Sequence, residues 1–252
     1  MQLKRRIINE CKGQPQRQKV VAMALFIKSK LGRSSMMRNY TINNLHTITG
    51  ISATTLHKYI PIMVRLRLVQ FFGDKKQHFA ITNLASHTDG RNINVDKFCF
   101  DSFKDVCNSL RAFLALFIQA RKDFIRRTIQ TVANPKNYKE HKAARKTMKR
   151  LVKQGIVASV NVKYKELGIS YKRIAKELGM CMRTAQNIIE YALEKNWAEK
   201  HKHIKAIDAP NINYFQADNC TYTTKNYICI VYANTYTLNP SLASNNNSCW
   251  YI

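Results

Sequence analysis

The stretch "SYKRIAKELGMCMRTAQNIIE", Ser170 to Glu190, contains a single glycine, Gly179, with apolar residues at helical spacing on both sides. Ile174 lies five residues before this glycine, and Ala185 and Ile188 lie six and nine residues after it. At these distances the apolar residues of one helix meet those of the next. Glycine in the turn permits the positive φ that a sharp change of direction requires. The stretch therefore predicts two short helices packed across a tight turn.

A second stretch, "YTINNLHTITGISATTLHKYI" (Tyr40 to Ile60), repeats this arrangement around Gly50. Leu45 lies five residues before Gly50, and Leu56 and Tyr59 lie six and nine residues after it. The chain thus contains two candidate helix pairs, each centred on a glycine.

The Gly50 pair has clear start signals but departs from the pattern at two positions. Thr41 and Ser52 are suitable N-caps for its two helices. His46 stands where a small residue is expected, and Pro61 falls within or just after the second helix. Because proline removes a backbone donor and bends a helix, we expect that helix to be short or broken in two.

A β-hairpin is predicted after the Gly50 pair. In "LVQFFGDKKQHFAIT" (Leu68 to Thr82) apolar residues alternate with polar ones on both sides of a turn at Gly73 and Asp74. Lys75 and Lys76 follow this turn, so the tip of the hairpin is basic.

A second hairpin is predicted after the Gly179 pair. We expect Trp197 and Ala198 on its first strand. Ile204 and Ala206 are expected on the returning strand, and the intervening "HKH" at 201–203 is expected to form a solvated basic turn rather than a pair of metal ligands.

A long helical pattern separates the two regions. From Phe103 to Val132 apolar residues recur at spacings of three and four, and Pro135 ends the pattern. The apolar face either packs against the first globular region, which the sequence mildly favours, or forms a dimer seam. A strongly basic segment follows at 136–155. Such a run is usually a solvated face, but its position just before the Gly179 pair favours phosphate contact.

The charge balance points to a polyanionic partner. The chain of 252 residues has 42 Lys and Arg against 15 Asp and Glu, a formal net charge of +27. Self-repulsion of this size is relieved when a polyanion neutralises it, and nucleic acid is the first candidate. An anionic membrane surface is the second, but the apolar runs at 20–27 and 112–118 are shorter than the roughly 20 residues of a transmembrane helix.

Cysteine usage and motif content argue against metal sites and catalysis. The seven cysteines are scattered and include no C-x-x-C pair, which suits a reducing compartment and excludes a zinc-site pattern. The sequence lacks a P-loop, a nucleophile elbow and an H-E-x-x-H motif. We therefore expect no enzyme activity, no catalytic residues, no cofactor and no metal.

A helix, a helix-turn-helix and a hairpin, occurring twice, resemble the tandem winged helix-turn-helix proteins. These include replication initiators of plasmids and phages, and they are similar to winged-helix transcriptional regulators. The resemblance covers about two thirds of the chain. It implies a mainly α fold with small β-hairpin wings, made of two winged helix-turn-helix domains joined by a helical linker. The expected domains are a basic N-terminal arm (1–17), a first winged helix-turn-helix domain (18–85), an amphipathic linker helix (96–134), a second winged helix-turn-helix domain (136–207) and an Asn/Thr/Tyr-rich, partly disordered C-terminal tail (208–252).

The resemblance also identifies candidate DNA contacts. Residues near the start of each second helix that avoid the core are the ones free to enter a major groove, where Arg reads guanine and Asn or Gln reads adenine. The base-reading candidates are Met182, Arg183, Thr184, Gln186 and Asn187 in one pair and Thr54, Thr55, His57 and Lys58 in the other. The phosphate-binding candidates are Lys172, Arg173, Lys176, Lys75, Lys76, Lys200, Lys202 and Lys205.

The expected function is sequence-specific binding of double-stranded DNA by a protein of a phage or mobile element. A transcriptional regulator and a replication initiator both fit, and the alternative is a basic protein that binds RNA or DNA without sequence preference. The expected partner is double-stranded DNA. A homodimer is left open, no membrane partner is expected, and the expected location is the cytoplasm, on the nucleoid.

Overall fold

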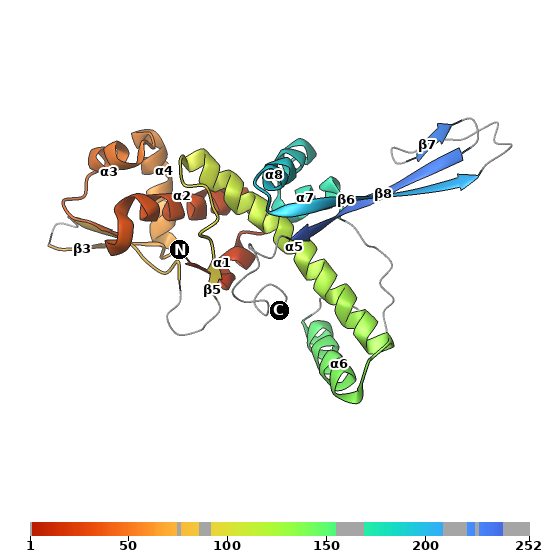
Figure 1. Ribbon diagram of the computed structural model, residues 1–252. Helices are drawn as coiled ribbons and strands as arrows, with labels where there is room; N and C mark the ends of the chain where they lie inside the picture. The colour runs from red at the N-terminus through yellow and green to blue at the C-terminus, as the bar shows by residue number, and fades with distance from the viewer. Residues whose placement is uncertain are drawn as a thin grey trace. The chain divides into compact units, whose positions relative to one another are not determined.

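The computed structural model describes residues 2–74, 77–85, 92–154, 169–208, 221–224 and 227–238. These residues are mainly helical with small antiparallel strands, so the predicted fold class is confirmed at that level (Figure 1). The elements are β1 (Gln2–Lys4), α1 (Arg5–Glu10), α2 (Pro15–Leu31), the 3-10 helix η1 (Gly32–Ser34), β2 (Met36–Met37), α3 (Ile42–Thr49), α4 (Ala53–Arg65), β3 (Val69–Phe72), β4 (His78–Ile81), β5 (Asn92–Asn94), α5 (Phe103–Ala133), α6 (Tyr138–Lys153), α7 (Tyr171–Leu178), α8 (Met182–Glu194), β6 (Ala198–Asp208), β7 (Thr221–Thr224) and β8 (Tyr227–Leu238).

The described residues form two compact units whose limits differ from the predicted domain limits. The first unit contains described residues of 1–115 together with 171–197, and the second contains described residues of 116–170 and 198–239. Both helix pairs therefore belong to the first unit, although they lie far apart in the sequence. The long helix α5 is continuous, with its first part in one unit and its second part in the other.

Helix α2 forms the centre of the first unit. It starts with Pro15 at its first turn, and every residue from Val20 to Ile27 is buried. A helix that is apolar on all sides must be covered on all sides. Helices α3 and α4 and strands β2 and β4 pack on it, and Phe103 of α5 lies against Phe26 with ring centroids 6.4 Å apart.

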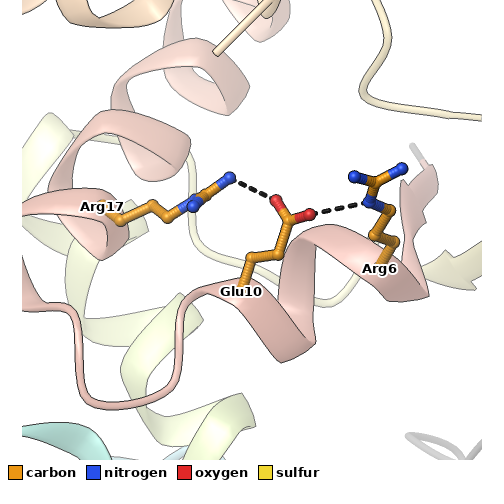
Figure 2. A network of polar contacts seen from close by, with 3 residues as sticks. All are labelled: Arg6, Glu10 and Arg17. Atoms are coloured by element: carbon orange, nitrogen blue, oxygen red, sulfur yellow. Dashed lines mark hydrogen bonds and ion pairs between the residues drawn. The ribbon is translucent and has the colours of Figure 1, made fainter.

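The N-terminal residues are part of this core, contrary to the expected basic arm. Leu3, Ile8 and Cys11 are fully buried, and β1 pairs antiparallel with β5. Glu10 accepts hydrogen bonds from Arg6, at 2.7 Å, and from Arg17 of α2 (Figure 2). Two of the basic side chains in 1–17 thus neutralise an acid, while Leu3 and Ile8 lie in the core.

The strand that pairs with β1 lies in a polar segment of the chain. Residues 86–91 lie outside the described residues, but 92–94 form β5, in register with β1 through Leu3 and Ile93. Backbone pairing with a distant strand stabilises this polar segment, a signal that local composition does not carry.

The first helix pair and its hairpin are formed as predicted, except at Pro61. Thr41 and Ser52 cap α3 and α4, and β3 pairs with β4 while β2 pairs with the other side of β4. Pro61 neither shortens nor breaks α4, which continues to Arg65. Pro61 is exposed, and so is His57, whose carbonyl would accept the missing hydrogen bond. Water can satisfy that carbonyl, so the helix tolerates the proline.

The two helix pairs correspond residue for residue at an offset of 129 positions, the distance from Gly50 to Gly179. Helices α3 and α7 each contain 8 residues, and α4 and α8 each contain 13. The two glycines adopt φ angles of 66° and 68°. Past the second helices, Arg67 and Asn196 adopt φ angles of 56° and 54°. The two pairs therefore share helix lengths and turn geometry.

Burial repeats at the same offset. Leu45 and Ile174 are both fully buried, as are Leu56 and Ala185. Thr49 and Leu178, Tyr59 and Ile188, Ile60 and Ile189, Met63 and Ala192, and Leu68 and Trp197 are also buried pairs. The exposed positions of α4 and α8 consequently lie on corresponding faces.

In the second unit, α6 packs against the second part of α5. Asn137 caps α6 by accepting the Glu140 N–H at 2.9 Å, and Glu140 accepts the Lys136 N–H at 3.0 Å. This reciprocal arrangement fixes the start of the helix. Met148 and Leu151 of α6 form an apolar cluster with Ile125 of α5.

The second predicted hairpin is wrong in its strand assignment. Ala198, Ile204 and Ala206 all lie on one strand, β6, and the returning strand is β8, far downstream. Trp197 precedes the strand, and His201 and His203 lie within it at an irregularity of the β6–β8 register. Residues 198–207 contain no Gly, Pro, Asn or Asp, so nothing in this segment favours a turn.

The expected C-terminal tail contributes strands to the same sheet. Strands β7 and β8 fall within 208–252, and the sheet order is β6-β8-β7. The Ile169 N–H donates to the Asn234 carbonyl of β8 at 2.9 Å. In the first half of the chain, the Tyr40 N–H donates to the Gln77 carbonyl at 2.7 Å. Tyr40 and Ile169 are also 129 residues apart, so this link to the hairpin repeats. Residues 239–252 lie outside the described residues.

Within the described residues, no helix combines the length and the apolar composition that crossing a bilayer requires.

Candidate nucleic-acid interface

The α7–α8 pair is fixed by the turn at Gly179. Ile174, Ala175 and Leu178 of α7 are buried against the apolar face of α8. The Met180 N–H closes the turn by donating to the Ala175 carbonyl at 2.9 Å. The opposite face of α8 is left exposed.

Gln18 of α2 connects the α7–α8 pair to the rest of the first unit. Its side chain is buried, and its Nε2 donates to the Leu178 carbonyl at 2.9 Å and to the Cys11 carbonyl at 3.0 Å. Its Oε1 accepts from Arg111 of α5 at 3.4 Å. Both N–H groups of the buried amide and its oxygen therefore have partners. Through them Gln18 of α2 is linked to three other segments of the chain: the turn after α1, α5 and α7.

The turn before α2 makes a second connection at the same place. The Gly13 N–H donates to the Glu177 carbonyl at 2.8 Å. A Cβ on Gly179 would lie 2.9 Å from the Gly13 carbonyl oxygen, whereas a Cβ on Gly50 would meet nothing within 4 Å. Gly179 is therefore needed both for its positive φ and for this close backbone approach.

The far end of α8 is held by aromatic packing. The Tyr191 hydroxyl lies 2.9 Å from the Ser109 hydroxyl of α5, and burial raises the pKa of Tyr191. Trp197 stacks on Phe98 with ring centroids 5.8 Å apart and meets Tyr191 edge-on at 6.1 Å. These contacts fix the C-terminal end of α8 within the first unit.

Of the five base-reading candidates on α8, three are freely exposed and two have local partners. Arg183 and Asn187 are exposed one helical turn apart, and Met182 is 60% exposed. Thr184 is half-buried with its hydroxyl 3.1 Å from the Cys181 sulfur, and Gln186 donates to Glu190 at 2.8 Å. Because reading adenine needs both the donor and the acceptor of an amide, Asn187 is better placed for it than Gln186.

The corresponding residues on α4 show the same division. Thr54, His57 and Lys58 are exposed, and Thr54 and Lys58 occupy the positions of Arg183 and Asn187. Thr55 is half-buried, and its hydroxyl accepts a hydrogen bond at 2.8 Å from Ser52, the N-cap residue of α4. The structure thus brings four exposed polar side chains to equivalent positions on two helices.

The phosphate-binding candidates on α7 are exposed, and one of them is already paired. Lys172 and Lys176 are exposed, and Arg173 forms an ion pair with Glu177 at 2.6 Å. The equivalent residues of α3 are Asn43, Asn44 and Thr47, which carry no charge. Charged side chains for phosphate contact therefore lie on the first helix of one pair only.

The wing candidates are five lysines. Lys75 and Lys76 lie outside the described residues. Lys200 and Lys202 are exposed on β6, and Lys205 lies on the same strand. These three lysines therefore follow the backbone of one strand rather than a hairpin tip.

Sequence reasoning missed two features of this site. Gln18 was overlooked, although a glutamine bordering the apolar run at 20–27 is a signal of a buried polar link. The Gln186–Glu190 pair was also overlooked, although a spacing of four on one helix predicts contact.

Cys181 stands at the N-cap of α8, where Ser52 stands in α4. Its side chain is exposed, and the hydrogen bond with the Thr184 hydroxyl lowers its pKa. Burial, in contrast, raises the pKa of Cys11 to about 12. No group of three His, Cys, Asp or Glu residues suited to a metal ion occurs in the part of the chain that the structure describes.

No family model, no curated protein and no solved structure matches this chain.

Proposed function

We propose that the chain is a tandem winged helix-turn-helix protein that binds double-stranded DNA sequence-specifically, without enzymatic activity. In this proposal α3–α4 and α7–α8 are the two helix-turn-helix motifs, and α4 and α8 are the recognition helices. The hairpin β3–β4 and the antiparallel strand pair β6–β8 are the wings. What carries the proposal is the repetition, at an offset of 129 residues, of a helix pair whose second helix exposes polar side chains at equivalent positions.

The chemistry of those side chains supports base reading. Arg183 offers a bidentate contact to guanine, and Asn187 one to adenine. Thr54 offers a methyl group to thymine, and Lys58 a donor to guanine. Residues before each recognition helix would supply backbone contacts that set the register, Lys172 and Lys176 among them. The net charge of +27 would bring the protein to DNA through counterion release.

Selection from a pool of random duplexes at near-physiological salt tests this proposal. We expect a defined motif, and we expect Arg183→Ala and Asn187→Ala to weaken binding to it by about 1–3 kcal/mol each while relaxing the preference at one base pair. Thr54→Ala and Lys58→Ala should relax the preference at other base pairs. Glu194→Ala, on an exposed position at the end of α8, is the matched control and should leave the motif intact.

Two outcomes would replace the proposal. A pool that stays random, with affinity that falls steeply as salt rises, would identify a basic protein that binds nucleic acid without reading it. Tighter binding to single-stranded or structured RNA than to duplex DNA would point to RNA as the partner.

The arrangement of the selected motif distinguishes the two biological roles. Direct repeats of the motif near a replication origin of a phage or plasmid would favour a replication initiator. A single site overlapping a promoter would favour a transcriptional regulator. An intracellular, nucleoid-associated location belongs to the same proposal, and so does a homodimer, which the length and symmetry of the selected site would reveal.

A further inference from the structure

Helix α6 has one apolar edge and one strongly basic face. Ala144, Met148 and Leu151 form the apolar edge, and they are buried. The last two belong to the cluster with Ile125 of α5, so this edge is the packed side of the helix.

Five lysines lie on the side of α6 opposite the apolar edge. They follow one another at spacings of three, four, three and four residues, which places them within a narrow strip of a helix with 3.6 residues per turn. All are exposed, and none has an ion-pair partner among the described residues. This lysine strip consists of Lys139, Lys142, Lys146, Lys149 and Lys153.

The two helix pairs do not account for the charge of the protein. Residues 41–65 contain two basic residues, Lys58 and Arg65, and no acid. Residues 170–194 contain four basic residues against three acids. Helix α6 alone has seven, the lysine strip together with Arg145 and Arg150, against the single acid Glu140. The densest positive charge of the described helices therefore lies outside the proposed base-reading surfaces.

The composition of the strip suits phosphates better than bases. Lysine is a flexible point charge, and the strip contains no Asn, Gln or Arg that would make a bidentate contact to a base edge. From its first lysine to its last the strip rises about 21 Å along the helix, the axial length of roughly six base pairs. A duplex backbone offers a row of negative charges on this scale.

We propose that the lysine strip of α6 is a second DNA-binding surface, which contacts the phosphodiester backbone of double-stranded DNA without reading sequence. The inference rests on the proposed function for the choice of DNA as the polyanion. It adds a source of affinity that is separate from the recognition helices and equal for all sequences.

The test compares the full-length protein with the triple variant Lys142→Gln/Lys146→Gln/Lys149→Gln. Glutamine keeps a high helix propensity and removes the charge. Affinity is measured by fluorescence anisotropy between 50 and 200 mM salt, on the selected duplex and on a scrambled duplex of equal length. Three lost contacts should make the slope of log K against log salt less negative by about 2.7 on both duplexes. The affinity gap between wild type and variant should therefore narrow about 40-fold across this salt range.

A matched variant separates local contact from total charge. Lys30→Gln/Lys97→Gln/Lys104→Gln removes the same charge from exposed positions of the first unit that belong to no proposed site. Equal slopes for the two variants would overturn the inference. So would unchanged DNA binding by the α6 variant together with lost binding to vesicles containing phosphatidylserine, which would identify an anionic membrane as the partner.

The same measurements keep the two proposals apart. If wild type binds the selected and scrambled duplexes equally, sequence reading fails, while a slope change in the α6 variant still supports the strip. If sequence preference is strong and the α6 variant has the wild-type slope, the strip fails and the proposed function stands.

Discussion

The helix pairs α3–α4 and α7–α8 have the same backbone geometry and almost no sequence in common. Between 42–65 and 171–194, identical residues occur at three positions: Gly50 and Gly179, Thr55 and Thr184, and Ile60 and Ile189. Helix lengths, burial and the φ angles of both turns nevertheless agree. A turn glycine and a set of apolar positions are enough to specify this arrangement.

The pairs differ in how they are attached to the rest of the first unit. The α3–α4 pair packs directly on α2, the central apolar helix. The α7–α8 pair is held by polar contacts to Gly13 and Gln18 and by the aromatic cluster around Trp197. The same motif can therefore be anchored by packing on an apolar helix in one place and by hydrogen bonds together with aromatic packing in another.

The sharpest difference should appear at the two glycines. Gly50→Ala places a Cβ in open space at positive φ, with an expected loss of about 1–2 kcal/mol of stability. Gly179→Ala adds a clash with the Gly13 carbonyl, and we expect a total loss of about 2–5 kcal/mol. Urea unfolding of both variants measures these values. Equal losses would mean that the approach of Gly13 to Gly179 contributes nothing.

Removal of Gln18 should loosen the second pair more than the first. Gln18→Leu leaves the Leu178 and Cys11 carbonyls without their buried donor, at an expected cost of about 1–3 kcal/mol. Faster amide hydrogen exchange in α7 than in α3 is the expected sign. Gln16→Ala, an exposed position on the same helix, is the control and should change stability by less than about 0.5 kcal/mol. Uniformly faster exchange in both pairs would contradict a specific role for Gln18.

Pro61 and Glu190 occupy the same position in α4 and α8. Replacement of Pro61 by alanine restores a backbone donor in the helix interior, and we expect a gain of about 1–3 kcal/mol in stability. Glu190→Ala should be nearly neutral for folding and should free the Gln186 amide. Thermal unfolding compares the two. A destabilised Pro61→Ala variant would show that the proline stabilises α4 through its restricted unfolded state.

The smallest effects are expected at the two N-caps. Ser52 accepts the Thr55 N–H at 3.3 Å, whereas Cys181 makes no such side-chain bond. Ser52→Ala should therefore destabilise the protein by about 1 kcal/mol, and Cys181→Ser should stabilise it by about 0.5–1 kcal/mol. Denaturant midpoints of the two variants should move in opposite directions. An unchanged midpoint for Cys181→Ser would mean that Cys181 already caps α8 as well as a serine does.

Much of the local structure was predictable because its signals are short-range. The glycine-centred pairs, the caps at Thr41 and Ser52, the end of α5 before Pro135 and the hairpin of β3 and β4 all follow from residues within one element or turn. The exposed base-reading candidates follow from the same periodicity, because the apolar face of each helix defines the opposite one.

Other features depended on partners that are distant in the sequence. Residues 2–4 form a strand because they pair with β5, and residues 198–208 form one long strand because they pair with β8. Neither partner can be inferred from the residues of the strand itself. The predicted return at Ile204 and Ala206 was wrong for that reason. Gln186 donates to Glu190, so of the two candidate amides on α8 Asn187 is the one available to a base. Helical periodicity alone does not distinguish between these two amides.

Local sequence specifies the helix pairs, since a positive-φ glycine and apolar residues at helical spacing act within about twenty residues. The sequence also determined the charge, and with it the class of partner that we propose. Tertiary contacts alone join α7–α8 to the first unit through Gln18 and Gly13 and pack α6 against Ile125 of α5. Long-range hydrogen bonds and burial depend on which segments meet in space, and no local pattern encodes that choice.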